Sequence, residues 1–281
     1  MLSMIRQLPK FRKAIRNEHD QVERLVQMHR IDIVISDNRY GCWSKRVRSV
    51  IITHQVHPLM PSGFGWLSPI VHNYSDRCLE KFEQVWIPDR PGSGMTDSFN
   101  PRPTPNQRYI GWLSRFSSNK VSIPKYEILA LVSGPEPQRT IFEKLMTDQL
   151  KASGKKSLLV AGVTEKTFHR FEDNLEIVNH LTLQSLQEAM LSAEIVISRS
   201  GYSTLMDLMV LGRNAIFVPT PGQPEQLFFA EYYKLKKIAF SCDQESFSLS
   251  KALEASHEYV GFSSFTIEGD YLTNAISTLL S

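Results

Sequence analysis

No stretch of this 281-residue sequence contains the roughly 18 consecutive apolar residues that a membrane-spanning helix needs. The N-terminal segment M-L-S-M-I-R-Q-L-P-K-F-R-K also lacks the apolar core of a secretory signal. Apolar residues make up 42% of the chain and charged residues 22%, which is usual for globular domains. We therefore expect a cytoplasmic protein.

Cysteines are few, and they do not follow a metal-binding pattern. Cys42, Cys78 and Cys242 are odd in number and widely separated, which predicts reduced packing residues rather than a disulfide framework or a zinc site. Neither a metal nor another cofactor is expected. Aromatic and basic residues are not interleaved as they are in nucleic-acid-binding domains, so nucleic acid is not an expected partner.

Charge is distributed unevenly along the chain. Residues 1–110 hold 16 Lys and Arg against 10 Asp and Glu, whereas the remainder holds 16 against 19. The basic N-terminal half favours an anionic partner, such as acidic lipid headgroups or a phosphate-bearing acceptor. A basic face that is merely solvated would give the same pattern.

The first 29 residues have the spacing of a basic amphipathic helix, predicted over residues 2–29 with a break around Asn17 to Asp20. Its polar side carries Arg6, Lys10, Arg12, Lys13 and Arg16. Such a helix can lie on a membrane surface, here the inner face of the membrane, or pack on its own domain with its charges in water. Both interpretations stay open.

Alternating strand and helix patterns predict two α/β domains. The first is assigned to residues 1–100, a proline-rich linker to 101–120, and the second domain to 121–281. An alternation of this kind in the second domain is typical of a doubly wound parallel sheet. Its six predicted strands are Tyr126–Val132, Ser157–Ala161, Glu176–Val178, Glu194–Ser198, Ala215–Val218 and Ile238–Phe240.

A turn and helix start follow the predicted strand that ends at Ser198. Gly201 can bring a ligand close to the main chain, and Ser203 and Thr204 begin a helix. Free amides and the positive end of the helix would bind a phosphate there. Asp207, one turn onward, could accept hydrogen bonds from ribose hydroxyls.

Two further segments are expected at the same end of this sheet, because ligands bind beyond the carboxyl ends of parallel strands. Glu225 and Gln226 start the next helix. Gly134 follows the first strand of the domain, and Arg139 could pair with a diphosphate. A surface charge in the first helical turn is the alternative for Arg139.

The motifs S-R-S-G-Y-S-T-L-M-D-L and V-P-T-P-G-Q-P-E-Q resemble the donor-binding region of glycosyltransferase family 28, and a weaker resemblance covers residues 105–281. The resemblance implies a GT-B enzyme of two Rossmann-like domains. It would transfer a hexose or N-acetylhexosamine from a UDP-sugar to an unknown acceptor without a metal. The implied donor-binding residues are Arg199, Ser200, Gly201, Tyr202, Ser203 and Thr204 for the diphosphate, Asp207 for the ribose, and Glu225 and Gln226 for the sugar.

The first domain is shorter than in that family, where a strand, a Gly-rich loop ending in His and a helix come first. No G-x-G-H occurs in this sequence. We therefore expect an incomplete first domain, with a partial sheet, an unsatisfied edge and exposed apolar side chains.

Polar residues follow two predicted strands of the first domain, Ile31–Ile35 and Arg48–Thr53. Asp37 and His54 are the candidates for the base that activates an acceptor hydroxyl, although capping or a structural hydrogen bond would also explain them. A nucleotide-sugar-binding protein without catalysis, or an inactive shortened homologue, is the alternative function. A sugar-nucleotide epimerase is a weaker one, because no carboxylate and His set appears in the second domain.

Overall fold

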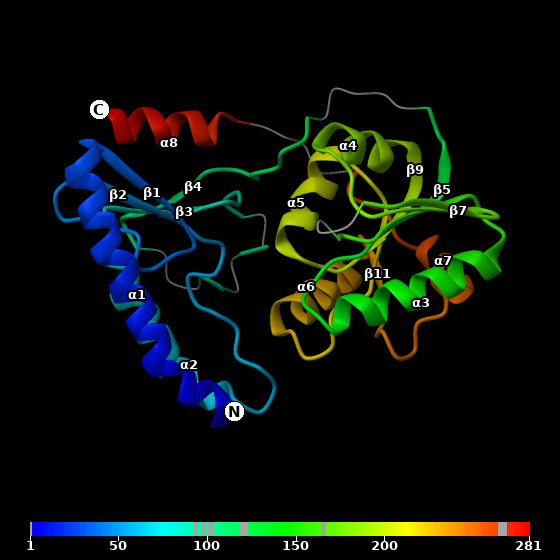
Figure 1. Cartoon of the computed structure of the whole chain (residues 1–281), viewed down its shortest axis with the longest axis horizontal. Coiled ribbons are helices and arrows are strands. Elements are labelled where there is room, and N and C mark those ends of the chain that lie inside the picture. The colour runs from blue at the N-terminus through cyan, green and yellow to red at the C-terminus, as the bar shows by residue number, and fades with distance from the viewer. Residues whose placement is uncertain are drawn as a thin grey trace. The chain divides into compact units, whose positions relative to one another are not determined.

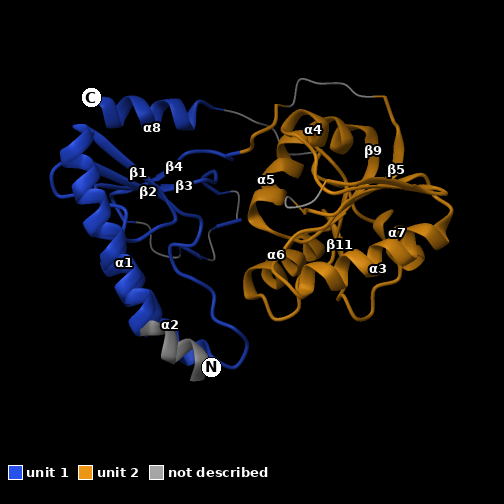
Figure 2. Cartoon of the chain, viewed as in Figure 1, with its two compact units in different colours: residues 1–113, 269–281 blue, residues 114–268 orange. Residues whose placement is uncertain are grey.

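The computed structural model describes residues 2–92, 95–96, 99–100, 104–117, 123–163, 167–263 and 269–281. The chain divides into two compact units (Figure 2). The first unit comprises residues 1–113 and 269–281, and the second comprises residues 114–268. Part of the predicted linker, including residues 101–103 and 118–120, lies outside the described residues.

The first unit is built on a four-stranded parallel sheet in the order β1-β2-β3-β4. The strands are β1 (Ile33–Asp37), β2 (Arg48–Ile52), β3 (Gln84–Ile87) and β4 (Gln107–Tyr109). The helices are α1 (Leu2–His29), α2 (Ser68–Leu79) and α8 (Tyr271–Leu280), with a short 3₁₀ turn, η1 (Gly65–Leu67). As an edge strand, β1 pairs on one side only, and Ile35 on it is 52% exposed, in agreement with the expected small sheet.

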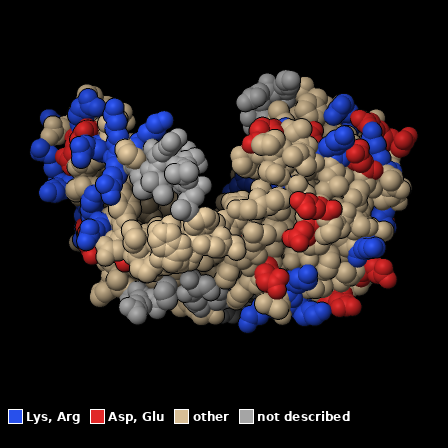
Figure 3. Space-filling view, turned by 90° about the horizontal axis from the view of Figure 1, so that it is seen from below, with Lys and Arg blue, Asp and Glu red and all other residues tan. Residues whose placement is uncertain are grey.

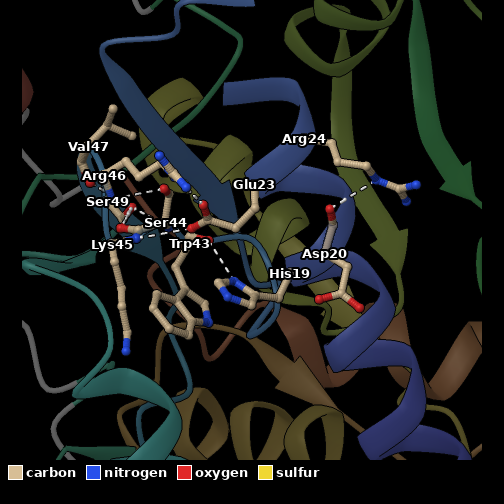
Figure 4. Close-up of polar contacts among 10 residues, drawn as sticks. All are labelled: His19, Asp20, Glu23, Arg24, Trp43, Ser44, Lys45, Arg46, Val47 and Ser49. Carbon is tan, nitrogen blue, oxygen red and sulfur yellow. Dashed lines mark hydrogen bonds and ion pairs between the residues drawn. The ribbon is translucent and has the colours of Figure 1, made fainter. Parts of the chain in front are cut away.

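Helix α1 is continuous, so the break predicted around Asn17 to Asp20 is wrong. Tertiary contacts outweigh the weak helix propensity there, because this stretch holds the connection from β1 to β2 (Figure 4). The His19 ring stacks on Trp43 with centroids 4.0 Å apart, and its Nδ1 lies 3.0 Å from the Trp43 carbonyl oxygen. One turn onward, Glu23 accepts a hydrogen bond from Arg46 Nε at 3.1 Å.

The second unit is built on a seven-stranded sheet in the order β11-β10-β9-β5-β6-β8-β7. Its strands are β5 (Tyr126–Leu131), β6 (Ser157–Val160), β7 (His169–Glu172), β8 (Leu175–Val178), β9 (Ala193–Ser198), β10 (Ala215–Phe217) and β11 (Phe240–Ser241). Six are parallel, as predicted, and the seventh, β7, pairs antiparallel with β8 at one edge.

Helices cover both faces of this sheet (Figure 1). They are α3 (Gln138–Ser153), α4 (Leu183–Ser192), α5 (Tyr202–Leu211), α6 (Pro224–Leu235) and α7 (Leu249–Ser256). Phe142, Met146 and Leu150 of α3 share one buried core with Leu249 and Ala252 of α7, while α4 and α5 lie on the opposite face (Figure 1). The doubly wound α/β class predicted from the sequence is therefore confirmed.

The units differ from the predicted domain bounds in two places. Strand β4 lies within the predicted linker and pairs with β3, so this segment belongs to the first unit. Helix α8, predicted within the second domain, also belongs to the first unit. Its Ala275 and Leu279 pack with Val50 and Trp86, and a hydrogen bond joins Arg48 to the carbonyl oxygen of Leu279. Burial of this apolar face explains where the helix docks.

Candidate functional site

The second sheet changes winding direction between β5 and β9. From β5 the sheet continues through β6 and β8 on one side and through β9, β10 and β11 on the other. Ligands of doubly wound sheets bind beyond the carboxyl ends of the strands at such a switch point. The loops that begin there are residues 132–137 after β5, residues 199–201 after β9 and residues 218–223 after β10.

Three glycines face open space in these loops, Gly134, Gly201 and Gly222. Gly134 has φ of +113°, a backbone conformation that favours glycine, and a Cβ built on it would meet only Thr220 Oγ1, at 3.9 Å. Gly201 has φ of −76°, so its backbone does not require glycine. A Cβ built on Gly201 meets no described atom within 4 Å. The loop after β9 therefore leaves room for a ligand next to the main chain.

Helix α5 begins at this opening without a side-chain cap. Gly201 is its N-cap residue, and the first intrahelical bond runs from Leu205 N to the Gly201 carbonyl oxygen at 3.0 Å. Helices α3 and α6 also begin without a side-chain cap, whereas Thr182 caps α4 by accepting a hydrogen bond from Ser185 N at 3.3 Å. The amides of the first turn of α5 and the positive end of its dipole can bind an anion.

The buried side chain of Arg199 connects neighbouring loops of the second unit. This side chain is 1% exposed and donates hydrogen bonds to the carbonyl oxygens of Val218 and Pro219 and to Gln244 Oε1, at 2.8, 3.2 and 2.6 Å. Burial lowers the pKa of Arg199 to about 10, so the guanidinium keeps its charge at neutral pH. Its terminal nitrogens bond to the protein, whereas the buried Nε has no hydrogen-bond partner among the described residues, and the contact of this side chain with a sugar donor stays a prediction.

Ser200 and Gln226 connect the loop after β9 with the start of α6. Ser200 Oγ donates to the Gln226 carbonyl oxygen at 2.7 Å, and Gln226 Oε1 accepts from Thr220 N at 2.8 Å. Both residues are buried. The buried hydroxyls of Ser198 and Thr220 have no hydrogen-bond partner among the described residues. Polar groups without a partner at the carboxyl end of the sheet can bind a ligand or water.

Arg139 is on the first turn of α3 and is paired within the protein. It makes ion pairs with Glu136 and Glu143 at 2.6 and 2.7 Å and donates to the Ala161 carbonyl oxygen at 3.1 Å. Its side chain is 17% exposed. A donor phosphate could reach it only in competition with two carboxylates, and the contact of Arg139 with a diphosphate stays a prediction.

Asp207 lies on the second turn of α5 beside two residues that the sequence did not indicate. Ser114 Oγ donates to Asp207 Oδ1 at 2.7 Å, and Arg115 Nε lies 3.6 Å from Oδ2. Burial raises the pKa of Asp207, while Ser114 and Arg115 act in the opposite direction. Arg115 is 58% exposed and adds a positive charge beside the carboxylate.

The remaining predicted donor-binding residues surround the same helix ends. Tyr202 is buried, with its ring 5.7 Å from that of Phe229. Ser203 is exposed, and Thr204 is half-buried on the first turn of α5. Glu225, also half-buried, lies in the first turn of α6. Of this set, Ser203, Thr204 and Glu225 have side chains that a ligand can reach.

In the first unit, Asp37 and His54 follow neighbouring strands at the carboxyl end of the sheet. Asp37 ends β1 opposite Ile52, and Thr53 Oγ1 donates to Asn38 Oδ1 at 3.0 Å. A pocket of about 310 Å³ in the first unit is lined by Phe11, Ala14, Ile15, Glu18, Asn38, Arg39, Tyr40, Gln55 and Pro58. This lining includes the sequence neighbours of the two candidate bases, Asn38 and Gln55, but neither Asp37 nor His54. The structure thus places both candidate bases at one end of the sheet, and a catalytic role for either stays a prediction.

Within the described ranges, no three His, Cys, Asp or Glu side chains are grouped as metal ligands. The three cysteines are free thiols. None of the described helices combines the length and hydropathy needed to cross a membrane.

Residues 141–258 match the family model described as the glycosyltransferase family 28 C-terminal domain. This segment is a glycosyltransferase family 28 C-terminal domain. It contains the turn at Gly201, helix α5 with Asp207 and the start of α6, so the resemblance seen in the sequence is confirmed. A search of curated proteins gives no match.

Solved glycosyltransferase structures share the fold of the chain. The spinosyn rhamnosyltransferase SpnG in complex with thymidine diphosphate superposes with a TM-score of 0.61 at 13% identity, covering 96% of this chain and 80% of that one. The glycotransferase of kitacinnamycin gives 0.60 at 16% identity, covering 98% and 78%. MurG of Acinetobacter baumannii gives 0.59 at 13% identity, covering 95% and 78%. The two-domain GT-B architecture is thus confirmed, with identities that indicate the fold alone.

Proposed function

We propose that the protein is a glycosyltransferase that binds a nucleoside diphosphate sugar, of the UDP type, on its second unit. The observation that carries the proposal is the open, uncapped start of α5 at Gly201, within the family 28 C-terminal domain and at the switch point of the sheet. The diphosphate would lie against the amides of Tyr202, Ser203 and Thr204. The pentose would lie toward Asp207, and the sugar toward Glu225.

Catalysis by this mechanism needs no metal. The leaving diphosphate gains negative charge as the bond to the sugar breaks, and the fixed amides of α5 stabilise that charge. The acceptor hydroxyl is activated by His54 or Asp37 of the first unit. Replacing the true base, with His54→Ala or Asp37→Asn, lowers kcat by about a hundredfold or more and leaves UDP affinity unchanged.

Titration calorimetry with UDP tests the donor site. Gly201→Trp places a large side chain where a Cβ meets no described atom, so we expect it to fill the diphosphate position, and circular dichroism checks that the fold is retained. We expect UDP binding to be lost in Gly201→Trp and kept in the control Asp148→Trp, which alters an exposed residue of α3. Equal UDP affinity in wild type and Gly201→Trp would remove the turn from the site.

A nucleotide-sugar-binding protein without transferase activity is the second candidate. The small sheet of the first unit favours this candidate, since it has four strands, against seven in the second unit. Turnover separates the two functions. UDP release from a UDP-sugar, with or without acceptor, identifies an enzyme, whereas tight UDP binding without turnover identifies a binding protein.

We further propose that α1 contacts an anionic membrane surface, which would place the acceptor side at the inner face of the membrane. Lys10, Arg12, Lys13 and Arg16 are exposed on α1, and Figure 3 shows Lys and Arg gathered along the first unit. Phe11 on α1, Trp66 on η1 and Ile70 on α2 are 47%, 66% and 66% exposed. Basic and apolar groups together suit lipid headgroups and the apolar layer beneath them.

A further inference from the structure

The Asp207 carboxylate is shielded within the second unit. Asp207 is 6% exposed, and its two oxygens face Ser114 Oγ at 2.7 Å and Arg115 Nε at 3.6 Å. Ser114 is half-buried and Arg115 is exposed. Both residues that contact the carboxylate are therefore more exposed than Asp207 itself.

The hydrogen bonds of Ser114 determine what that hydroxyl can still bind. A serine hydroxyl has one proton to donate and two lone pairs that accept. Its proton goes to Asp207 Oδ1, and one lone pair accepts from Phe116 N at 3.0 Å. In the described part of the chain, one acceptor position remains. The next partner of Ser114 must therefore supply an O–H or N–H group.

The segment that carries Ser114 is held in place by the two residues Phe116 and Ser117. Phe116 is buried, at 7% exposure, and Gln187 Nε2 of α4 donates to the Ser117 carbonyl oxygen at 2.7 Å. The Asp207 carboxylate fixes the direction of the Ser114 proton, which leaves the remaining lone pair directed away from Asp207. The hydroxyl is thus positioned before a ligand arrives, which lowers the entropic cost of binding.

We propose that Ser114 is a nucleotide-binding residue whose Oγ accepts a hydrogen bond from a ribose hydroxyl of the donor, with Asp207 as its positioning residue. The proposal rests on the proposed function, because it assumes that a nucleotide lies at α5. A site that accepts from a ribose hydroxyl binds the deoxy analogue less well, since the hydrogen bond is lost. Ser114 therefore makes the donor site selective for ribose over deoxyribose.

Calorimetry with UDP, 2′-deoxy-UDP and 3′-deoxy-UDP on wild type and Ser114→Ala tests the proposal. Wild type is expected to bind one of the deoxy compounds about tenfold more weakly than UDP, the effect of one hydrogen bond between neutral groups. Ser114→Ala is expected to bind UDP about as weakly as that analogue. The ratio of the dissociation constant of the analogue to that of UDP therefore falls to about one in this variant. The deoxy compound with the weaker binding identifies the hydroxyl.

Two controls keep a structural effect apart from a ligand contact. Ser114→Thr retains a hydroxyl and is expected to restore discrimination, whereas Ser117→Ala changes an exposed neighbour whose contact is through its main chain and leaves the ratio as in wild type. An unchanged ratio in Ser114→Ala overturns the proposal. Tighter UDP binding by Ser114→Ala also overturns it, because the serine would then be a competitor of the ribose.

These experiments distinguish a wrong role for Ser114 from a wrong position of the donor site. Loss of UDP binding in Gly201→Trp together with an unchanged ratio in Ser114→Ala refutes the role of Ser114 alone. Absence of UDP binding by wild type refutes both proposals.

Discussion

The guanidinium carbon of Arg199 lies 4.0 Å from the centre of the Phe142 ring, deep in the core of the second unit. This cation–π contact joins the turn after β9 to helix α3. Together with the hydrogen bonds to the carbonyl oxygens of Val218 and Pro219, it holds the loops on either side of the proposed donor site at a fixed separation.

Arg199→Met is expected to lower the free energy of unfolding by about 3 kcal/mol, because it leaves buried carbonyl oxygens without a donor. Urea unfolding followed by circular dichroism measures the loss. The control Arg170→Met alters an exposed residue of β7 and should change stability by less than about 0.5 kcal/mol. Full stability in Arg199→Met combined with loss of UDP binding would instead make this arginine a direct donor ligand.

Asp207→Asn is expected to change how stability depends on pH. Burial raises the pKa of Asp207 in the folded chain, so the unfolded chain ionises first as the pH rises from about 4. The contribution of this group is present at low pH and is lost as the pH passes the raised folded pKa. Between the unfolded and the folded pKa of Asp207, the free energy of unfolding of wild type should therefore fall relative to that of Asp207→Asn. At neutral pH the difference between the two free energies should stay constant.

Unfolding in urea at intervals between pH 4 and pH 8 measures this difference. A wild type that gains stability relative to the Asn variant as the pH rises would show that Ser114 and Arg115 outweigh burial. UDP affinity of the same variant, measured in parallel, reports the ligand role separately.

Neighbouring residues at the start of α6 should behave differently when replaced. Gln226→Leu removes the acceptor of the buried Thr220 N–H and should cost about 1–3 kcal/mol of stability, with both UDP-glucose and UDP-N-acetylglucosamine used less well. Glu225→Gln should keep stability and change the ratio of kcat/KM between the two sugars. Equal effects on both donors from Glu225→Gln would place the sugar elsewhere.

Membrane contact through α1 should depend on charge. Co-sedimentation with phosphatidylglycerol vesicles is expected to fall about fivefold for each basic residue neutralised, as in Lys10→Gln and Lys13→Gln, since each contributes about 1 kcal/mol at an anionic surface. Higher salt should weaken binding in the same way, and phosphatidylcholine vesicles should bind little. Lys144→Gln, on an exposed site of α3, serves as the control. Equal binding to both lipids would refute an electrostatic contact.

Strands buried on both faces were predictable from the sequence, because they are continuous apolar runs. The run predicted over Glu194–Ser198 is strand β9, Ala193–Ser198. Strand β7 was missed because it lies at the edge and its residues, His169 to Glu172, are polar or exposed. The length of β4, three residues, likewise gives no periodic signal.

Only those parts of the proposed site that are formed by neighbouring residues of the sequence were predictable. A turn with glycine at a strand end indicates the start of α5, and the structure retains that feature. Ser114 and Asp207 are 93 residues apart, and no local pattern links them. The contact of Arg199 with the buried Phe142 ring could not be predicted either, because it depends on how the core of the second unit is assembled.

The return of α8 to the first unit makes the second unit an insertion within the first. During synthesis, residues 114–268 leave the ribosome as one uninterrupted stretch, whereas Ala275 and Leu279, which pack on Val50 and Trp86, emerge after that stretch. Domains generally fold as units while the chain is being made. The second unit is therefore expected to mature first, and the first unit must await α8 to close its core.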